Sequence, residues 1–324
     1  MYRKDRDLHD ITGKFMEENI GRRKKWGRIA KTLLKVTVTL IALYWVSTKV
    51  NFLDVRDALL RSNFFYLLLA LLMYFISQLI ASSRLYGYFR GIGLPINETY
   101  NFKLYLLGLF YNMFLPGGIG GDGYKLYFLR KKFGISGKKL FSAIFFDRLS
   151  GLWALSLITA ALVIFIPQLG IPNWVPIIVV LLGTIIYYLL LWKFFKTFAG
   201  SFFISHLKAV GAWSFQIIAV ILLLYALGFE GKFSPYLFTF LLSSLVAVIP
   251  LSAGGLGLRE MANVYGATYF SLDTHLAVLI SLLFYIIALL VAFGGAYFIF
   301  RPDALGEHRL PKADEVEKEM DNLL

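Results

Sequence analysis

A ten-residue pattern of glycines and one basic residue occurs twice in the chain, at 116–125 and again at 250–259. Both copies read Pro-x3-Gly-Gly-x-Gly-x-[Lys/Arg], so that Lys125 or Arg259 closes each glycine cluster. Proline ends a preceding helix, and glycine permits positive φ and the close approach of a ligand to the main chain. Free N–H groups at the start of a following helix can bind an anion. The pattern predicts two anion-binding turns, against the alternative that the glycines only permit tight turns and close helix packing.

Charged side chains near these turns and inside apolar runs form a second set of candidates. Asp122 and Lys125 can share a helix face, and Asp147 and Arg148 lie about 12 Å inside an apolar run if it is helical, at 1.5 Å per residue. Guanidinium groups match phosphate bidentately, whereas a structural ion-pair network, such as Asp147 with Lys125, is the alternative. The candidate substrate-binding residues are Arg84, Asn112, Gly117, Gly118, Gly120, Gly121, Asp122, Lys125, Asp147, Arg148, Gly254, Gly255, Gly257, Arg259 and Glu260.

Residues for cofactor or metal chemistry are not grouped in the sequence. The chain has no cysteine, its four histidines are scattered, and it has neither a Walker loop nor a Gly-x-Ser-x-Gly motif. We therefore expect no catalytic residue and no cofactor. If transport is coupled to an ion, protons carried by Asp122, Asp147 or Glu260 are the expected driver.

The composition indicates the medium in which these residues work. Of the 324 residues, 58% are hydrophobic and only 16% are charged, with a mean hydropathy of +0.67. Several apolar runs approach or exceed the roughly 20 residues that span a bilayer. The net charge of +13 is concentrated beside apolar runs, which favours contact with anionic lipid over nucleic acid. We predict an all-α polytopic membrane protein.

Eight apolar segments can be placed along the chain. They cover about 32–50, 64–89, 104–115, 140–166, 174–192, 211–228, 235–250 and 275–300. The third and the seventh are too short for a comfortable span, and each ends at one copy of the glycine pattern. If all eight crossed the membrane, the strongly basic loop 116–139 would lie outside, against the positive-inside rule.

A re-entrant third segment returns this basic loop to the cytoplasmic side. The same reasoning makes the seventh segment dip from the outside, so that each half reads span, span, dip, span in opposite orientation. Such inverted repeats are typical of transporters, with broken helices that meet near the midplane. We predict about six full spans and two re-entrant elements, at about 104–127 and 235–271.

The predicted organisation has four parts. A basic cytoplasmic tail covers 1–31, the first membrane repeat 32–166, the inverted second repeat 174–300, and a cytoplasmic tail 301–324 that we expect to be solvated. Both termini would lie on the cytoplasmic side of the cell (inner) membrane.

Three motifs in this order give the sequence a family resemblance. Residues 120–125, 147–152 and 254–260 resemble the transmembrane region of the lysylphosphatidylglycerol synthases and its stand-alone membrane relatives. The resemblance implies a flippase module for aminoacylated phosphatidylglycerol, acting with a separate lipid-modifying enzyme because the aminoacyl-transferase domain is not recognised in this chain. Lys125 replaces a common Arg, and Ala253 a common Pro, which leaves the headgroup open.

Two functional hypotheses follow from the residues and the resemblance together. The first is a transporter that binds the phosphate of a phospholipid or polyprenyl-phosphate lipid between the two glycine loops. The second is a membrane enzyme or accessory subunit of lipid or glycan synthesis that uses a polyprenyl-phosphate, with Asp122 or Glu260 as base. A purely structural subunit is the remaining alternative.

Overall fold

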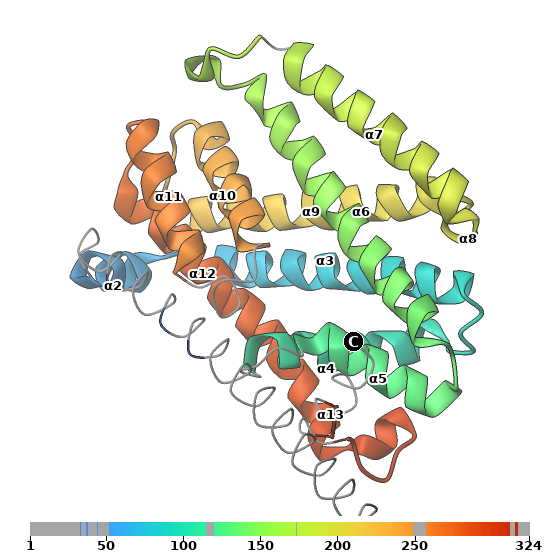
Figure 1. Ribbon diagram of the computed structural model, residues 1–324. Coiled ribbons are helices and arrows are strands. Elements are labelled where there is room, and N and C mark those ends of the chain that lie inside the picture. Colours follow the sequence, from blue (N-terminus) through green and yellow to red (C-terminus); the bar gives the residue numbers. More distant parts are fainter. Residues whose placement is uncertain are drawn as a thin grey trace, which may run out of the picture.

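The structure is a computed structural model that describes residues 52–114, 120–172, 174–248, 257–311 and 315–316, together with Leu33, Thr37 and Tyr44. Within these residues every regular element is helical (Figure 1), in agreement with the predicted all-α class. The α-helices are α2 (Phe52–Arg61), α3 (Phe64–Gly91), α4 (Glu98–Phe114), α5 (Gly120–Phe133), α6 (Gly137–Val163), α7 (Trp174–Phe194), α8 (Lys196–Ala199), α9 (Phe202–Ala226), α10 (Phe233–Ala247), α11 (Leu258–Tyr269), α12 (Thr274–Phe293) and α13 (Tyr297–Phe300).

Five helical stretches of the described chain are long and apolar enough to cross a membrane. They are α3, α6, α7, α9 and the run Thr274–Phe300 that begins with α12. These five match the second, fourth, fifth, sixth and eighth apolar segments of the sequence. The first segment, at 32–50, lies outside the described residues apart from isolated positions. The chain is therefore a multi-pass membrane protein.

The third and seventh apolar segments form short helices that are each followed by a second short helix. Helix α4 has 17 residues and α10 has 15, so they extend roughly 25 Å and 22 Å, less than the 30 Å of hydrocarbon. Helix α4 packs against α5, and α10 packs against α11. Each copy of the glycine pattern thus joins the two arms of a helical hairpin.

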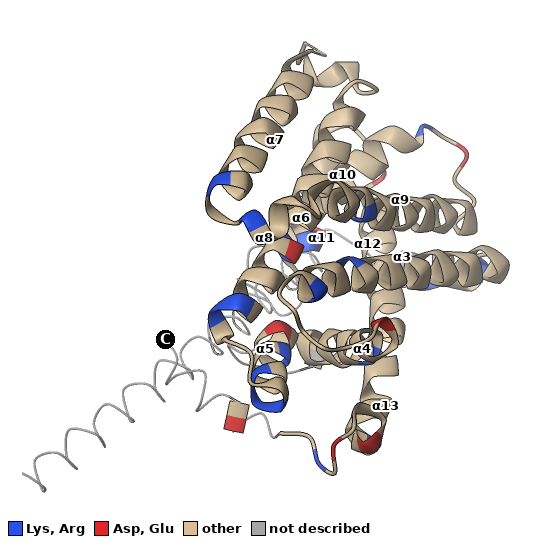
Figure 2. Cartoon of the chain, turned by 90° about the vertical axis from the view of Figure 1, so that its right-hand side faces the viewer, with Lys and Arg blue, Asp and Glu red and all other residues tan. Residues whose placement is uncertain are grey.

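The long helices α3 and α9 lie side by side at the centre of the molecule (Figure 1). Helix α10 lies on one side of this pair, and the α4–α5 hairpin lies on the other, as both views show (Figure 2). Helices α6 and α12 cross the pair, and each packs on the hairpin of the other half: α6 contacts α10, and α12 contacts α4. The two halves are therefore interlocked.

Helix α3 owes its central position to one continuous buried face. Small and polar residues recur along that face at helical spacing, among them Ala70, Tyr74, Gln78, Ala81 and Arg84. Helix α7 is the opposite case, because it is apolar all round and only Leu191 is buried. Side chains that a soluble protein would cover are exposed along α7, as expected of a lipid-facing helix.

The beginning of the C-terminal tail is packed against the protein, which corrects the expectation of a solvated segment. Leu305 and Leu310 are buried, and Lys132 of α5 donates to the carbonyl of Leu305 at 2.5 Å. Tyr124 of α5 also donates to the carbonyl of Pro311 at 3.3 Å. The expectation rested on the many charges of the tail and took no account of Leu305 and Leu310, which are buried where the tail contacts the α4–α5 hairpin.

Candidate functional site

The first hairpin is closed by a direct contact across the glycine loop. Helix α5 begins at Gly120, which has a φ of +44°, and the next N–H, of Gly121, donates to Asn112 Oδ1 of α4 at 2.6 Å. A Cβ on Gly121 would overlap the backbone of Gly108, so the two arms cross where neither has a side chain. Asn112, a predicted binding residue, therefore caps the start of α5, and the missing side chain of Gly121 allows the two arms to approach closely.

A charged triad lies just inside this hairpin. Asp122 forms an ion pair with Lys125 through one oxygen, 2.7 Å from Nζ, and its other oxygen accepts from Arg148 Nε of α6 at 2.7 Å. The side chain of Lys125 is 5% exposed, whereas that of Arg148 is 60% exposed. The triad carries one negative and two positive charges, so it retains an excess positive charge, and Arg148 keeps an accessible surface.

The Asp122 carboxylate is held in its ionised form. Burial works to raise the pKa of Asp122, but the cations Arg148 and Lys125 outweigh burial and hold that pKa below its usual range. The two cations thus stabilise the negative charge of Asp122.

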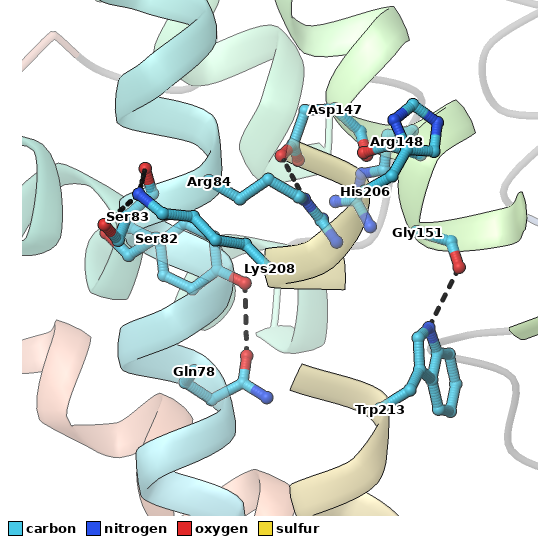
Figure 3. A network of polar contacts seen from close by, with 12 residues as sticks. Gln78, Ser82, Ser83, Arg84, Asp147, Arg148, Gly151, His206, Lys208 and Trp213 are labelled. Carbon is cyan, nitrogen blue, oxygen red and sulfur yellow. Dashed lines mark hydrogen bonds and ion pairs between the residues drawn. The ribbon is translucent and has the colours of Figure 1, made fainter. Parts of the chain in front are cut away.

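A separate buried ion pair links the central helix to α6. Arg84 Nε donates to Asp147 Oδ1 at 2.8 Å, with both side chains less than 10% exposed (Figure 3). A Cβ on Gly151, one turn along α6, would lie 3.3 Å from the Arg84 guanidinium, so the glycine makes room for it. Asp147 therefore pairs with Arg84 and not with Lys125, the partner considered for it in the sequence.

The second hairpin uses its acidic residue differently. Helix α11 begins at Leu258, and Gly257 before it has a φ of +84°. Glu260 accepts from the N–H of Gly257 at 2.6 Å and from the hydroxyl of Ser281 on α12 at 2.8 Å. Glu260 thus caps its own helix and ties it to α12. We predicted free N–H groups at this helix start. The N–H of Gly257 is not free, because it donates to the Glu260 side chain.

Arg259 has no carboxylate within ion-pair distance among the described residues. One Nη donates to Ser244 Oγ of α10 at 2.6 Å, and the guanidinium lies over the rings of Phe240 and Phe284, 4.8 and 5.0 Å from their centroids. Its Nε is buried with no hydrogen-bond partner in the same part of the chain. Glu260 is directed elsewhere, so the contacts of the Arg259 guanidinium in the described chain are two aromatic faces and one hydroxyl.

The buried face of α3 connects the two hairpins. Near the second hairpin, Tyr74 packs edge-on against Phe284, the same ring that carries Arg259. One turn further along, Gln78 accepts from the hydroxyl of Tyr105 on α4 at 3.1 Å (Figure 3), and Lys125 lies 5.3 Å from the centroid of that tyrosine ring. Tyr74 and Gln78, called the polar path below, therefore contact the ring beside Arg259 at one end and the tyrosine beside Lys125 at the other.

The predicted candidates fall into three groups. Asp122, Lys125, Arg148 and Arg259 lie at the two ends of this path, Arg84 and Asp147 form their own buried pair, and the others that the structure describes belong to the hairpin turns: Asn112, Gly120, Gly121, Gly257 and Glu260. Gly117, Gly118, Gly254 and Gly255 lie outside the described residues. Sequence reasoning missed residues whose types are common in any apolar helix, namely Tyr74, Tyr105, Ser244, Ser281 and Phe284. The four-residue spacing of Tyr74 and Gln78 was the one available signal, since it places two polar groups on one helix face.

The helices and the two hairpins define the class as a polytopic, all-helical membrane protein. Residues 32–210, more than half of the chain, match the family described as the lysylphosphatidylglycerol synthase TM region, and the chain belongs to this family. The resemblance noted in the three motifs is thereby confirmed.

A curated relative is the UPF0104 membrane protein PH1989 of Pyrococcus horikoshii. It is 28% identical over 167 residues, which cover 47% of this chain and 48% of that protein. The match thus spans about half the length of the relative, whose name specifies a membrane protein without an activity.

Proposed function

We propose that the protein transports a phosphate-bearing lipid across the membrane, with the headgroup bound between the two helical hairpins. The observation that carries this proposal is Arg259, a half-buried residue whose guanidinium has a buried Nε and no carboxylate partner among the described residues. Intramembrane cations are costly and are found where they face a partner or a pathway. A guanidinium lacking an internal anion is suited to bind a phosphate that comes from outside.

The polar path along α3 leads to a second cationic site for that phosphate, called the second station. At the other end, the triad of Asp122, Lys125 and Arg148 holds one more positive than negative charge. Gln78 and Tyr105 lie between the stations and offer neutral hydrogen-bonding groups. A phosphate headgroup could move from one cationic site to the other while polar groups surround it. The free-energy barrier to crossing is lower when the phosphate never enters hydrocarbon.

The paired hairpins support the proposal that the chain is an inverted repeat with two re-entrant elements. Each half contains a long central helix, a hairpin of two short helices and a crossing helix, in that order: α3, α4–α5 and α6, then α9, α10–α11 and α12. The reciprocal packing of α6 on α10 and of α12 on α4 is what a twofold relation between halves produces. Alternating access by rocking one half against the other follows from this design.

An apolar groove beside the path suits the acyl chains. A cavity of about 510 Å³ lies between α3, α4 and α12, and its walls include Leu72, Phe75, Leu106 and Leu290. Tyr74 stands on α3 between the groove-lining residues Leu72 and Phe75 but turns to the buried side. Headgroup and chains would therefore occupy opposite faces of one helix segment, with the chains open to the bilayer. By the positive-inside rule, both termini lie on the cytoplasmic side of the cell membrane.

A leaflet-exposure assay on the full chain in proteoliposomes tests the proposal. Fluorescent phosphatidylglycerol is placed in both leaflets, and a membrane-impermeant quencher reports the rate at which inner-leaflet lipid reaches the outside. We expect Arg259→Gln to slow this rate by about tenfold or more, because a charge-assisted phosphate contact contributes roughly 1.5–3 kcal/mol. Arg61→Gln, at the exposed end of α2, is the matched control. Equal rates for Arg259→Gln and wild type would contradict the proposal.

A further inference from the structure

A second cationic site lies away from the hairpins, where α3 and α7 end and α6 begins. A cavity of about 630 Å³ opens there, within the roughly 300–1,000 Å³ typical of ligand sites. Four of its wall residues are lysines: Lys138 and Lys139 from α6, Lys193 from α7, and Lys196 from α8. None of these residues belongs to the path between the two hairpins.

The four lysines converge without an internal counter-charge. No Asp or Glu lies within ion-pair distance of any of them in the described part of the chain, and no acidic residue lines the cavity. Lys138 and Lys139 stand in the first turn of α6, where the helix dipole favours acidic residues, so helix stability does not explain them. Figure 2 shows the basic residues of α6, α7 and α8 gathered at this end. The four lysines are exposed, and together they give this open cavity a positive potential that attracts an external anion.

Neighbouring groups specify what kind of anion fits. Ser142 and Thr197 also line the cavity and provide hydroxyl donors, which complement phosphate oxygens. Phe194 and Phe195 complete the wall as exposed aromatic side chains, and α7 above them presents an apolar surface to the bilayer. A ligand for this cavity thus combines a phosphate group with an apolar body that lies in the membrane.

We infer that this lysine cavity binds the headgroup of an anionic phospholipid that stays in its own leaflet. Basic pockets between membrane helices bind such headgroups, each lysine strengthening the attraction. The bound lipid would link α3, α6 and α7, because the cavity takes wall residues from all three. It is a structural or regulatory lipid, distinct in position from the transported one.

The test uses the fluorescence of Trp192, which is exposed and directly precedes Lys193. The purified full chain is titrated in mixed micelles with phosphatidylglycerol that carries bromine on its acyl chains, a short-range quencher of tryptophan. We expect saturable quenching that is lost in Trp192→Phe. The variant Lys139→Gln/Lys193→Gln/Lys196→Gln should weaken the apparent affinity by about tenfold or more. The matched control Arg56→Gln/Arg61→Gln/Lys232→Gln removes three exposed charges elsewhere and should leave it unchanged.

Three outcomes would overturn the inference. Equal weakening in the control variant would mean that only net charge matters. Equal quenching by brominated phosphatidylcholine would mean that the cavity does not select the anionic headgroup. Displacement of the lipid by inorganic pyrophosphate at lower concentration than the lipid itself would assign the cavity to a soluble phosphate. Size-exclusion profiles of both triple variants show whether they fold, and Lys193→Arg should retain binding if the site acts through charge.

Discussion

In the α4–α5 hairpin the basic residue of the glycine pattern, Lys125, is paired with Asp122 and lies in the second turn of its helix. In the α10–α11 hairpin the equivalent Arg259 lies in the first turn, and the acidic residue beside it, Glu260, caps the helix instead. The helices start at different points of the same pattern: α5 at the first glycine of the pair, and α11 four positions later in the pattern. The helix start differs by about one turn between the two hairpins. Lys125 has a carboxylate partner, whereas Arg259 has none among the described residues.

The crossing helices show the same division. The offset of 134 residues between the two pattern copies takes Asp147 of α6 to Ser281 of α12. Asp147 pairs with Arg84, whereas Ser281 donates to Glu260. The first half therefore pairs its carboxylates with its own cations and keeps one excess positive charge, beside the exposed Arg148. The second half leaves the Arg259 guanidinium without a carboxylate partner among the described residues.

Removing the buried carboxylate of the first half should have the largest effect on stability. Asp147→Asn leaves the Arg84 guanidinium buried without its counter-charge, which costs roughly 3–5 kcal/mol in comparable pairs. We expect a strong loss of folded protein in a denaturant titration of the detergent-solubilised chain. The double variant Arg84→Met/Asp147→Met should be more stable than Asp147→Asn, since both charges are gone. If Asp147→Asn unfolds like wild type, the first half is not held by this pair.

The next largest effect concerns how closely the arms of each hairpin approach. Gly121→Ala forces a methyl group into the backbone of Gly108, which cannot move aside, and overpacking of this kind costs about 1–3 kcal/mol. Gly266→Ala in the second hairpin meets only the side chain of Thr239, which can rotate, so we expect a smaller loss. Gly183→Ala on α7 has open space and serves as control. If Gly121→Ala and Gly266→Ala lower the thermal unfolding temperature equally, the two hairpins do not differ in how closely their arms approach.

The sequence could predict the helices and the hairpins because both depend on local features. Hydrophobic run length separated the five described spans from the short segments, and Pro with Gly-Gly marked the turns. The short third segment is a short helix, α4, in the structure. The re-entrant course that the basic loop at 116–139 favours stays a prediction. These properties follow from the bilayer, which acts on each segment independently.

Partners within the site could not be predicted in the same way. Arg84 and Asp147 are 63 residues apart, and only the packing of α3 on α6 brings them together. Glu260 follows Arg259 directly, but consecutive helix residues point in different directions, so adjacency said nothing about pairing. One of the two aromatic rings under Arg259, that of Phe284, comes from α12. Nothing in the residue type distinguishes Phe284 from the other 29 phenylalanines.

The smallest predicted effect concerns the fastening of the first hairpin to the C-terminal segment. Lys132 of α5 donates to Leu305 and pairs with Glu307 at 3.1 Å, but both charged side chains are partly exposed. Exposed pairs contribute at most about 1 kcal/mol, so Lys132→Ala should hardly change global unfolding. It should instead speed hydrogen exchange at 302–307, while α10 and α11 keep their protection. Lys232→Ala, at the start of α10, makes no such contact in the described structure and should leave both regions unchanged. Exchange that rises equally in both hairpins would show that the C-terminal segment stabilises the whole fold and not the first hairpin alone.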